Sequence, residues 1–290
     1  MLNRYGKLVL KTKKIAFIGG DERMLFAAEL FAQNGYRAAV YGFDGASAER
    51  FEISLSQSAE EALSDADYAV LPPLVSRDGE NIYAPLAKNK IPLRELRFGG
   101  ALVFAGGSCP KIMAETRAYS AEEAFAVRNA VPTAEGALKL AIEATGETVC
   151  GMRACVLGFG RIGTVLAKDL IALGASADVF ARRNEARALA EALGAHARPF
   201  AELEAEIGSY DCIFNTVPQR VLGAAALAKI KKGAPFIELA SAPGGADRAE
   251  ALALGVKFTD GGGLPGRIAP KSAGKIIYTT VSEMIEEEGI

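Results

Sequence analysis

Three glycines constrain this chain more than any other feature of its sequence. Gly158, Gly160 and Gly163 have the spacing G-x-G-x-x-G, between an apolar run at 154–157 and a helix-period segment at 161–173. In a strand–turn–helix unit the first glycine permits the tight turn, the second lets a pyrophosphate approach the backbone, and the third lets helix and strand pack closely. The helix N-terminus adds N–H donors and a partial positive charge for phosphate. The pattern therefore predicts a dinucleotide site.

Cofactor contacts are expected along the whole turn, from Gly158, Phe159, Gly160, Arg161, Ile162 and Gly163. The carboxylate that usually binds the ribose, about 20 residues after the first glycine, is missing. Arg182 and Arg183 stand there, just past a predicted strand at 176–180, whereas Asp178 lies inside that strand. Because arginine binds phosphate oxygens bidentately, the pair favours a 2′-phosphate and hence NADP, with NAD possible. Alternatively, both arginines belong to a solvated helix start.

The first half of the chain repeats this pattern in a broken form. A short apolar strand at 15–18 leads into Gly19, Gly20 and then Asp21, while Met24 stands at the place of the third glycine. A carboxylate at Asp21 would repel a pyrophosphate but suits a helix cap. We expect Asp21 to cap the helix and this half not to bind dinucleotide.

Alternating strand and helix patterns set the fold class, and 290 residues suggest two domains. The prediction is an α/β protein with two Rossmann-like, doubly wound parallel-sheet domains and an interdomain cleft. The expected parts are a Rossmann-like substrate or partner domain at 1–120, connecting helices at 121–150, an NAD(P)-binding Rossmann domain at 151–268, and a C-terminal helix at 269–290 that returns to the first domain. A helical stretch at 121–127 and a second helix starting near Pro132 form the connector.

Polar and small residues follow the later strands of the second half. Such strand ends form ligand sites in open α/β sheets. The expected contacts to the nicotinamide half of the cofactor are Asn215, Thr216, Val217, Pro218, Ala240 and Ser241.

Composition excludes several classes of protein. A net charge of −2 gives no field that would recruit nucleic acid. With no signal peptide and no run of about 18 apolar residues, a soluble cytoplasmic protein without membrane contact is expected. The four cysteines form no C-x-x-C pattern, so neither a disulfide framework nor a metal site is expected; Cys155 and Cys212 fall in predicted core strands. The single histidine, His196, is expected to be structural.

The chain resembles the family of the dipicolinate synthase A subunit from endospore-forming bacteria. The resemblance rests on the stretches NAVPTAEG (129–136), VLGFGR (156–161), IFNTVP (213–218), LASAPGG (239–245) and GLPGRIAPKSAG (263–274). It implies oxidation of dihydrodipicolinate to dipicolinate, a partner B subunit that is flavoprotein-like, and the mother-cell cytoplasm during sporulation. Arg267 replaces the lysine that is common in the family, which keeps the charge but changes the geometry.

A dicarboxylate substrate of this kind requires cationic and hydroxyl donors. The candidates for substrate binding are Arg77, Asn129, Thr133, Arg267, Lys271 and Ser272. Glu135 or Lys271 could accept the proton, because burial can tune either group toward neutral pH. The alternatives are a helix-favouring Glu135 and an exposed Lys271. Cys109 has no base near it in sequence and is not expected to be a nucleophile.

Two other functions fit the same residues. One is another two-domain NAD(P)-dependent dehydrogenase of the folate or amino-acid type. The other is a non-catalytic, dinucleotide-binding subunit that supports a partner, which the lack of a clear base favours. A homodimer is possible under each of these hypotheses.

Overall fold

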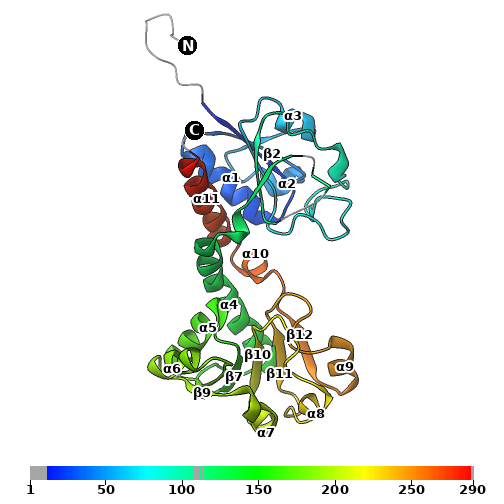
Figure 1. The fold of residues 1–290 in the computed structure, drawn as a ribbon. Coiled ribbons are helices and arrows are strands. Elements are labelled where there is room, and N and C mark those ends of the chain that lie inside the picture. The colour runs from blue at the N-terminus through cyan, green and yellow to red at the C-terminus, as the bar shows by residue number, and fades with distance from the viewer. Residues whose placement is uncertain (1–11, 108–110, 113, 289–290) are drawn as a thin grey trace, which may run out of the picture. The chain divides into compact units, whose positions relative to one another are not determined.

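The computed structural model describes residues 12–107, 111–112 and 114–288, and its internal contacts divide the chain into two compact units (Figure 1). Unit 1 comprises the described residues up to Arg128 together with those from Pro270 onward, and unit 2 is Asn129–Ala269. Cys109, considered above as a nucleophile, lies outside the described residues.

Unit 1 is built on a parallel sheet whose six described strands lie in the order β3-β2-β1-β4-β5-β6. The strands are β1 (Lys14–Ile18), β2 (Arg37–Tyr41), β3 (Ser54–Leu55), β4 (Tyr68–Val70), β5 (Leu102–Ala105) and β6 (Thr116–Ala118). This is the strand order of doubly wound dinucleotide-binding folds.

Alternate residues of β1 enter the two hydrophobic cores of unit 1. Ile15 and Phe17 pack with α1 (Glu22–Gln33) and α11 (Pro270–Glu287) on one face of the sheet. A Cβ on Gly274 of α11 would lie 2.6 Å from the carbonyl oxygen of α1 residue Arg23, so glycine lets these helices approach closely. The opposite face carries α3 and irregular chain. The shorter helices of unit 1 are α2 (Gly45–Ala48), α3 (Ala59–Leu63) and the 3₁₀ turns η1 (Leu93–Glu95) and η2 (Tyr119–Ala121).

Unit 2 repeats the same sheet, with its described strands in the order β12-β11-β10-β7-β8-β9 and all pairs parallel. The strands are β7 (Arg153–Leu157), β8 (Ser176–Phe180), β9 (His196–Arg198), β10 (Cys212–Asn215), β11 (Pro235–Glu238) and β12 (Lys257–Asp260). Counted from its own first strand, the order matches that of unit 1. The predicted fold class of two Rossmann-like parallel sheets is confirmed.

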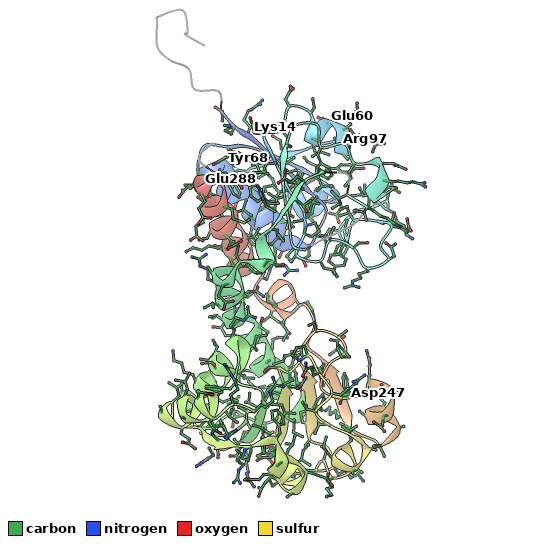
Figure 2. The ribbon with its side chains drawn as sticks, viewed as in Figure 1. Lys14, Glu60, Tyr68, Arg97, Asp247 and Glu288 are labelled. Carbon is green, nitrogen blue, oxygen red and sulfur yellow. The ribbon has the colours of Figure 1, made fainter. Side chains whose placement is uncertain are left out.

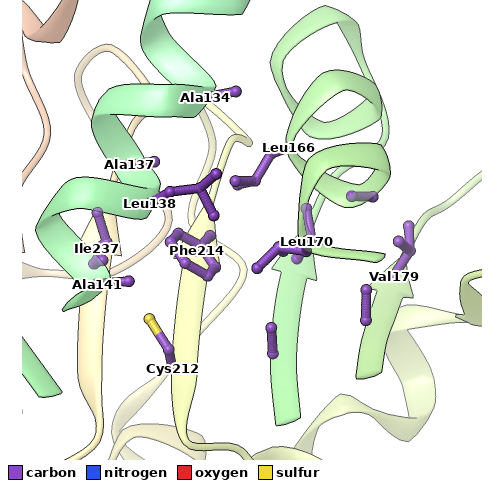
Figure 3. Close-up of a cluster of buried hydrophobic side chains, with 14 of the residues drawn as sticks. Ala134, Ala137, Leu138, Ala141, Leu166, Leu170, Val179, Cys212, Phe214 and Ile237 are labelled. Atoms are coloured by element: carbon purple, nitrogen blue, oxygen red, sulfur yellow. The ribbon is translucent and has the colours of Figure 1, made fainter. Parts of the chain in front are cut away.

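Helices cover both faces of this second sheet. On one face, Phe214 and Leu166 pack with the C-terminal part of α4 (Figure 3). On the other face, Cys155 joins a core with Tyr210 and Leu227. Cys155 and Cys212 are fully buried, as predicted, and burial raises the pKa of both thiols, so they act as small apolar side chains. The helices of unit 2 are α5 (Arg161–Ala172), α6 (Asn184–Ala192), α7 (Leu203–Glu206), α8 (Ala224–Leu227), α9 (Arg248–Ala253), α10 (Leu264–Ile268), η3 (Phe200–Glu202) and η4 (Ile207–Ser209).

The connector differs from the sequence prediction of two helices. A single helix, α4 (Glu123–Thr145), runs through Pro132 without a break. Proline removes one backbone hydrogen bond and disfavours a helix interior. Buried side chains on both sides of it, Phe125 in the unit 1 core and Ala134 in the unit 2 core, hold the helix together by packing.

Both sheets begin their first strand with the same hydrogen bond. The side chain of Asp67, just before β4, accepts the N–H of Lys14 at 2.7 Å. The side chain of Asp211, just before β10, accepts the N–H of Arg153 at 2.9 Å. In each unit an aspartate thus satisfies the N–H group that opens the central strand.

Candidate dinucleotide-binding site

The turn after β7 shows why two of its positions must be glycine. Gly158 has a φ of +94° and donates its N–H to the Phe180 carbonyl oxygen at 2.9 Å. A Cβ there would lie 2.6 Å from Oγ1 of Thr216, and a Cβ on Gly163 would lie 2.2 Å from the carbonyl oxygen of Gly158. Both approaches are closer than real Cβ contacts. The first and third glycines therefore close the turn and dock α5 onto it.

The middle glycine has the opposite surroundings. A Cβ on Gly160 would meet no atom within 4 Å, and Gly160 precedes α5 without any capping side chain. The first N–H groups of an uncapped helix are donors that need a partner. Open space beside such donors, on the positive end of a helix dipole, fits the pyrophosphate of a dinucleotide.

A pocket of about 500 Å³ adjoins this turn. Its apolar wall includes Phe200, Val217 and Pro218, which suit a flat aromatic base. Its full lining is Gly158, Phe159, Gly160, Ala181, Arg182, Arg183, Ala186, Phe200, Thr216, Val217, Pro218, Gln219, Arg220 and Val221. The structure thus brings the glycine turn, the arginine pair and the segment after β10 together around one hollow.

Arg182 and Arg183 follow β8 at the edge of this pocket. Both are exposed, Arg183 occupies the N-cap of α6, and its side chain makes no capping bond. Neither guanidinium forms an ion pair with another described residue. Two uncommitted guanidiniums at this edge can bind a phosphate group.

Arg220 also lines the pocket and was missed at the sequence level. Its guanidinium bonds to the Ala246 carbonyl oxygen and lies 3.2 Å from the carboxylate of Asp247, the α9 cap labelled in Figure 2. This anchoring fixes the third arginine in place. Nothing in its local sequence predicts that position, because the anchors lie 26 and 27 residues further along.

Asn215 supports the pocket from behind. It is fully buried, and its side-chain amide donates to the carbonyl oxygen of Val217 at 2.9 Å and to the carboxylate of Glu238 at 2.6 Å. The Asn215 side-chain oxygen accepts the Val217 N–H at 3.2 Å. The amide is thereby occupied inside the protein, so we expect Asn215 to act by fixing the backbone of Val217 beside the pocket.

Glu238 is a second residue that the sequence did not reveal. Its carboxylate accepts N–H bonds from Ala240 at 3.0 Å and from Gly245 at 2.8 Å, in addition to the Asn215 amide. It thereby holds the loop that contains Ala240 and Ser241. Neither of those two residues lines the pocket, so their predicted contact to the nicotinamide half stays a prediction.

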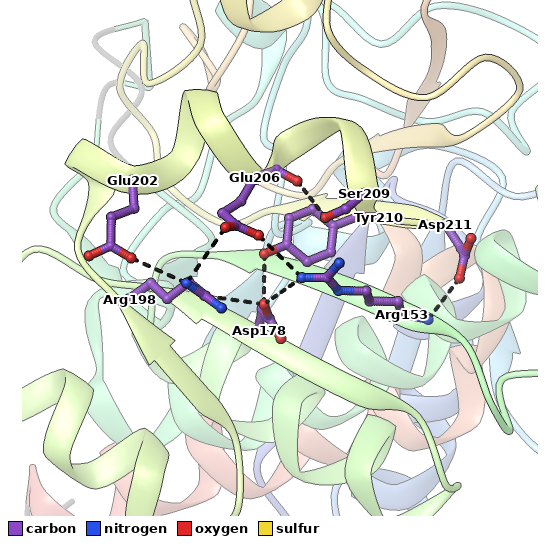
Figure 4. Close-up of polar contacts among 8 residues, drawn as sticks. All are labelled: Arg153, Asp178, Arg198, Glu202, Glu206, Ser209, Tyr210 and Asp211. Carbon is purple, nitrogen blue, oxygen red and sulfur yellow. Dashed lines mark hydrogen bonds and ion pairs between the residues drawn. The ribbon is translucent and has the colours of Figure 1, made fainter.

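Asp178 is unavailable to the ribose, as its place within β8 predicted. The residue is 2% exposed, and its carboxylate accepts the Tyr210 hydroxyl at 2.8 Å (Figure 4). Arg198 and Arg153 approach the same carboxylate oxygen at 3.3 Å and 3.5 Å. Burial, followed by the bond to Asp178, raises the pKa of Tyr210, which keeps that phenol a donor. Asp178 thus serves the packing of unit 2, with two partly exposed arginines beside it.

The predicted substrate and catalytic residues divide between the two units. Arg77, Lys271 and Ser272 belong to unit 1. The Arg77 guanidinium lies 4.5 Å from the ring centroid of Tyr83 in a separate hollow of about 300 Å³. Lys271 and Ser272 are exposed in the first turn of α11, where Lys271 agrees with the open alternative of a surface lysine.

The other four candidates belong to unit 2, and none of them lines the 500 Å³ pocket. Thr133 is 5% exposed, and its hydroxyl donates to the Asn129 carbonyl oxygen at 2.7 Å within α4. Arg267 donates to the carbonyl oxygens of Gly262 at 3.1 Å and Asp260 at 3.3 Å. Glu135 is exposed on α4. The roles of all four stay predictions.

In unit 1, Asp21 is the N-cap of α1, as predicted, and its carboxylate accepts the Arg23 N–H. The Arg23 guanidinium closes a bidentate pair with it, with both N–O distances 2.8 Å. The Asp21 carboxylate thus occupies the helix N-terminus where a phosphate would bind, and it would repel one. The pair therefore disfavours dinucleotide binding in unit 1.

Comparison with known proteins gives the same division of the chain. Residues 14–122 match the family of the dipicolinate synthase A subunit N-terminal domain, and residues 124–253 match "D-isomer specific 2-hydroxyacid dehydrogenase, NAD binding domain". The dipicolinate synthase A subunit of Bacillus subtilis (strain 168) is 29% identical over 94% of this chain and 96% of that protein. The crystal structure of the Bacillus halodurans A subunit has a TM-score of 0.83 at 27% identity and covers 96% of this chain and 99% of that one.

Over nearly its whole length the chain is similar to dipicolinate synthase A subunits, and residues 14–122 match the model of their N-terminal domain. The dehydrogenase-type domain in unit 2 indicates a nicotinamide dinucleotide cofactor and an oxidoreductase. An L-alanine dehydrogenase structure, 14% identical with a TM-score of 0.65 over 94% of this chain and 88% of that one, shares the fold alone. No helix within the described ranges has the length and apolarity that a membrane crossing requires.

Proposed function

We propose that this dipicolinate synthase A-type chain is an NADP-linked oxidoreductase that converts dihydrodipicolinate to dipicolinate together with a B subunit. The relative's name supports the reaction and the existence of further subunits. The observation that carries the cofactor assignment is the arginine pair, Arg182 and Arg183, on the rim of the pocket beside the glycine turn.

Different residues of the pocket would bind different parts of the cofactor. The N–H groups at the start of α5, beside Gly160, would hold the pyrophosphate, and Arg182 and Arg183 would hold the 2′-phosphate. Thr216 and Val217 would line the path toward the nicotinamide half. The bound cofactor supplies the hydride acceptor.

The substrate would lose a hydride and a proton as its ring becomes aromatic. Its two carboxylates require cationic partners, for which Arg77, Arg267 and Lys271 stay the candidates, supported by Asn129, Thr133 and Ser272. Glu135 or Lys271 would accept the proton. Aromatisation favours the product, so the protein has mainly to align the ring and neutralise its charges.

The proposal extends to domains and cellular setting. Residues 1–120 would bind substrate or partner, 121–150 would connect, 151–268 would bind the cofactor and 269–290 would return to the first domain. The mother-cell cytoplasm of a sporulating bacterium and an assembly with the B subunit, with or without a homodimer, would be the working context.

The direct test is turnover. The chain is purified with and without its B subunit, mixed with freshly prepared dihydrodipicolinate and NADP or NAD, and followed by the ultraviolet absorbance of dipicolinate. Product formation with NADP supports the proposal. No product with either cofactor in the presence of the B subunit would refute it, and product from the A chain alone would exclude the non-catalytic alternative.

Cofactor choice has its own test. Because a hydrogen bond to a charged group contributes about 1.5–3 kcal/mol, the double variant Arg182→Ala, Arg183→Ala should weaken NADP at least about tenfold and leave NAD nearly unchanged. Arg248→Ala is the matched control, since Arg248 is an exposed arginine of α9 that does not line the pocket. Equal weakening of both cofactors would remove the argument for a 2′-phosphate.

A further inference from the structure

Unit 1 contains a hollow of about 440 Å³ that the dehydrogenase reaction does not use. It opens at the carboxyl ends of β2 and β3, the edge at which open α/β sheets bind ligands. Its walls include Tyr41, Asp44, Leu55, Ser56 and Ile91. All of them belong to unit 1, so the hollow is complete within one compact unit.

Its position corresponds to the ribose end of the pocket in unit 2. Three residues after β8, the N-cap of α6 is Arg183. Three residues after β2, the N-cap of α2 is Asp44. In doubly wound folds a carboxylate after the second strand binds ribose hydroxyls, whereas arginine there suits a phosphate. Unit 1 thus has the carboxylate that unit 2 lacks.

The carboxylate of Asp44 is only half used by the protein. One of its oxygens accepts the N–H of Ser47 at 2.7 Å, and the other has no hydrogen-bond partner among the described residues. The second oxygen can therefore accept from a ligand hydroxyl while the first keeps α2 capped.

Ser56 offers a second polar group to a ligand in this hollow. It is 8% exposed, its N–H donates to the Val40 carbonyl oxygen at 2.8 Å, and its side chain lines the hollow. Its hydroxyl has no hydrogen-bond partner within the described part of the chain. The Ser56 hydroxyl is accessible to solvent, so it can donate to or accept from a polar ligand in the hollow.

The remaining walls offer apolar and amide surface to a ligand. Leu55 and Ile91 offer apolar surface to a planar ring, and the amide of Gln57 can pair with its polar edge. The path toward a pyrophosphate is closed, because the N–H of Gly20 already donates to the carbonyl oxygen of Tyr83 at 2.7 Å. We therefore expect a ligand here to have a base and a ribose but no pyrophosphate.

We propose that this hollow of unit 1 binds a nucleoside without a 5′-pyrophosphate. The ribose hydroxyls bond to the carboxylate of Asp44 and the hydroxyl of Ser56, and the base lies against Leu55. This site is separate from the dinucleotide pocket of unit 2 and does not depend on the proposed reaction.

Adenosine is the probe, titrated calorimetrically into the full chain. A ligand of this size in an open hollow should bind with a Kd on the order of 0.1 mM. Asp44→Asn, which keeps a good N-cap but loses the charge, should raise that Kd at least about tenfold. Leu55→Arg should abolish binding by filling the hollow, and 2′,3′-dideoxyadenosine should bind the unaltered chain at least about tenfold more weakly.

Two results would overturn the proposal. One is the absence of binding at about 10 mM adenosine, 100 times the expected Kd. The other is binding that Leu55→Arg and Asp44→Asn leave unchanged, which would put the nucleoside elsewhere on the chain. Leu55 is 36% exposed, so thermal unfolding of Leu55→Arg should match that of the unaltered chain and show that the fold is intact.

Discussion

The glycine turns of the two units follow strands in equivalent places of equivalent sheets, yet they face opposite surroundings. In unit 1, a Cβ on Gly19 would lie 2.4 Å from the side chain of Ile82, and the N–H of Gly20 is bonded to Tyr83. In unit 2, the space beside Gly160 is open. Strand order therefore supplies the edge of the sheet, and the occupancy of the turn decides whether a pyrophosphate can bind there.

The third glycine position of the turn also differs between the two units. Gly163 lets α5 touch the turn, whereas Met24 in unit 1 is fully buried and fills that contact with a side chain. A turn that is filled from inside by Met24 and from outside by Ile82 serves packing alone. Unit 1 therefore has the strand order of a nucleotide-binding fold with a first turn that its own side chains fill.

The largest loss of stability and of NADP binding is expected from a substitution at Gly163, in the glycine turn of unit 2. Gly163→Ala puts a Cβ 2.2 Å from the carbonyl oxygen of Gly158, so the turn must shift, at a cost of about 3 kcal/mol. Calorimetry should show unfolding at a lower temperature, and NADP titration should show no binding. Gly223→Ala is the control, because its Cβ would meet nothing within 4 Å and it lies outside the pocket. Unchanged stability and affinity would refute the packing role of Gly163.

A comparable but smaller loss is expected in the closed turn. Asp21→Ala removes the α1 cap and leaves the guanidinium of Arg23, which is 8% exposed, without its bidentate partner. The cost should be about 2 kcal/mol by chemical denaturation. Asp21→Asn keeps the cap and should cost less. An effect of Asp21→Ala on NADP binding at constant stability would contradict the separation of the two turns.

Gly160→Ala should have a smaller effect, because it should weaken cofactor binding without lowering stability. Gly160→Ala meets no atom in the protein, and Gly160 has an extended backbone that alanine adopts. Unfolding should therefore be unaffected. Its methyl group would occupy the space of the pyrophosphate, so the Kd for NADP should rise about 10- to 100-fold, measured by fluorescence or calorimetry. Wild-type affinity would show that the cofactor does not approach this turn.

The smallest effect compares the paired aspartates that open the two sheets. Burial disfavours the Asp211 carboxylate, but the bonds from Lys231 and from the Arg153 N–H outweigh it, so the pKa of Asp211 is lowered. A lowered pKa stabilises the fold above the ordinary carboxyl value of about 3.9 and loses that contribution as the pH falls. Asp211→Asn should cost about 1 kcal/mol at pH 7, with a smaller difference in acid.

Asp67→Asn in unit 1 is the matched variant for that measurement. Asp67 bonds the N–H of Lys14, but its nearest cation, Lys13, is 3.9 Å away. Denaturation of the unaltered chain and both variants between pH 3 and pH 7 should show that the stability lost in Asp211→Asn shrinks more in acid than the stability lost in Asp67→Asn. Equal curves would show that the charge of Lys231 contributes nothing.

Most strands could be predicted from apolar runs, and those that could not are short edge strands. Both residues of β3 are exposed, and β6 contributes only partly exposed or exposed side chains, so neither has a hydrophobic pattern to detect. The continuity of α4 was missed for the complementary reason. Pro132 signals a helix start locally, but burial of distant parts of the same helix outweighs that signal.

The sequence by itself determined the two parallel sheets, the capped turn at Asp21 and the open turn at Gly160, because glycine spacing and apolar periodicity act through local backbone geometry. Only the tertiary structure decided which polar groups are already hydrogen-bonded within the protein and which stay available to a ligand. Three hydrogen bonds illustrate this, and each joins residues more than 20 positions apart: Gly20 to Tyr83, Arg220 to Ala246, and Asn215 to Glu238. Such contacts depend on how the chain returns across the edge of a sheet, and no local pattern encodes that path.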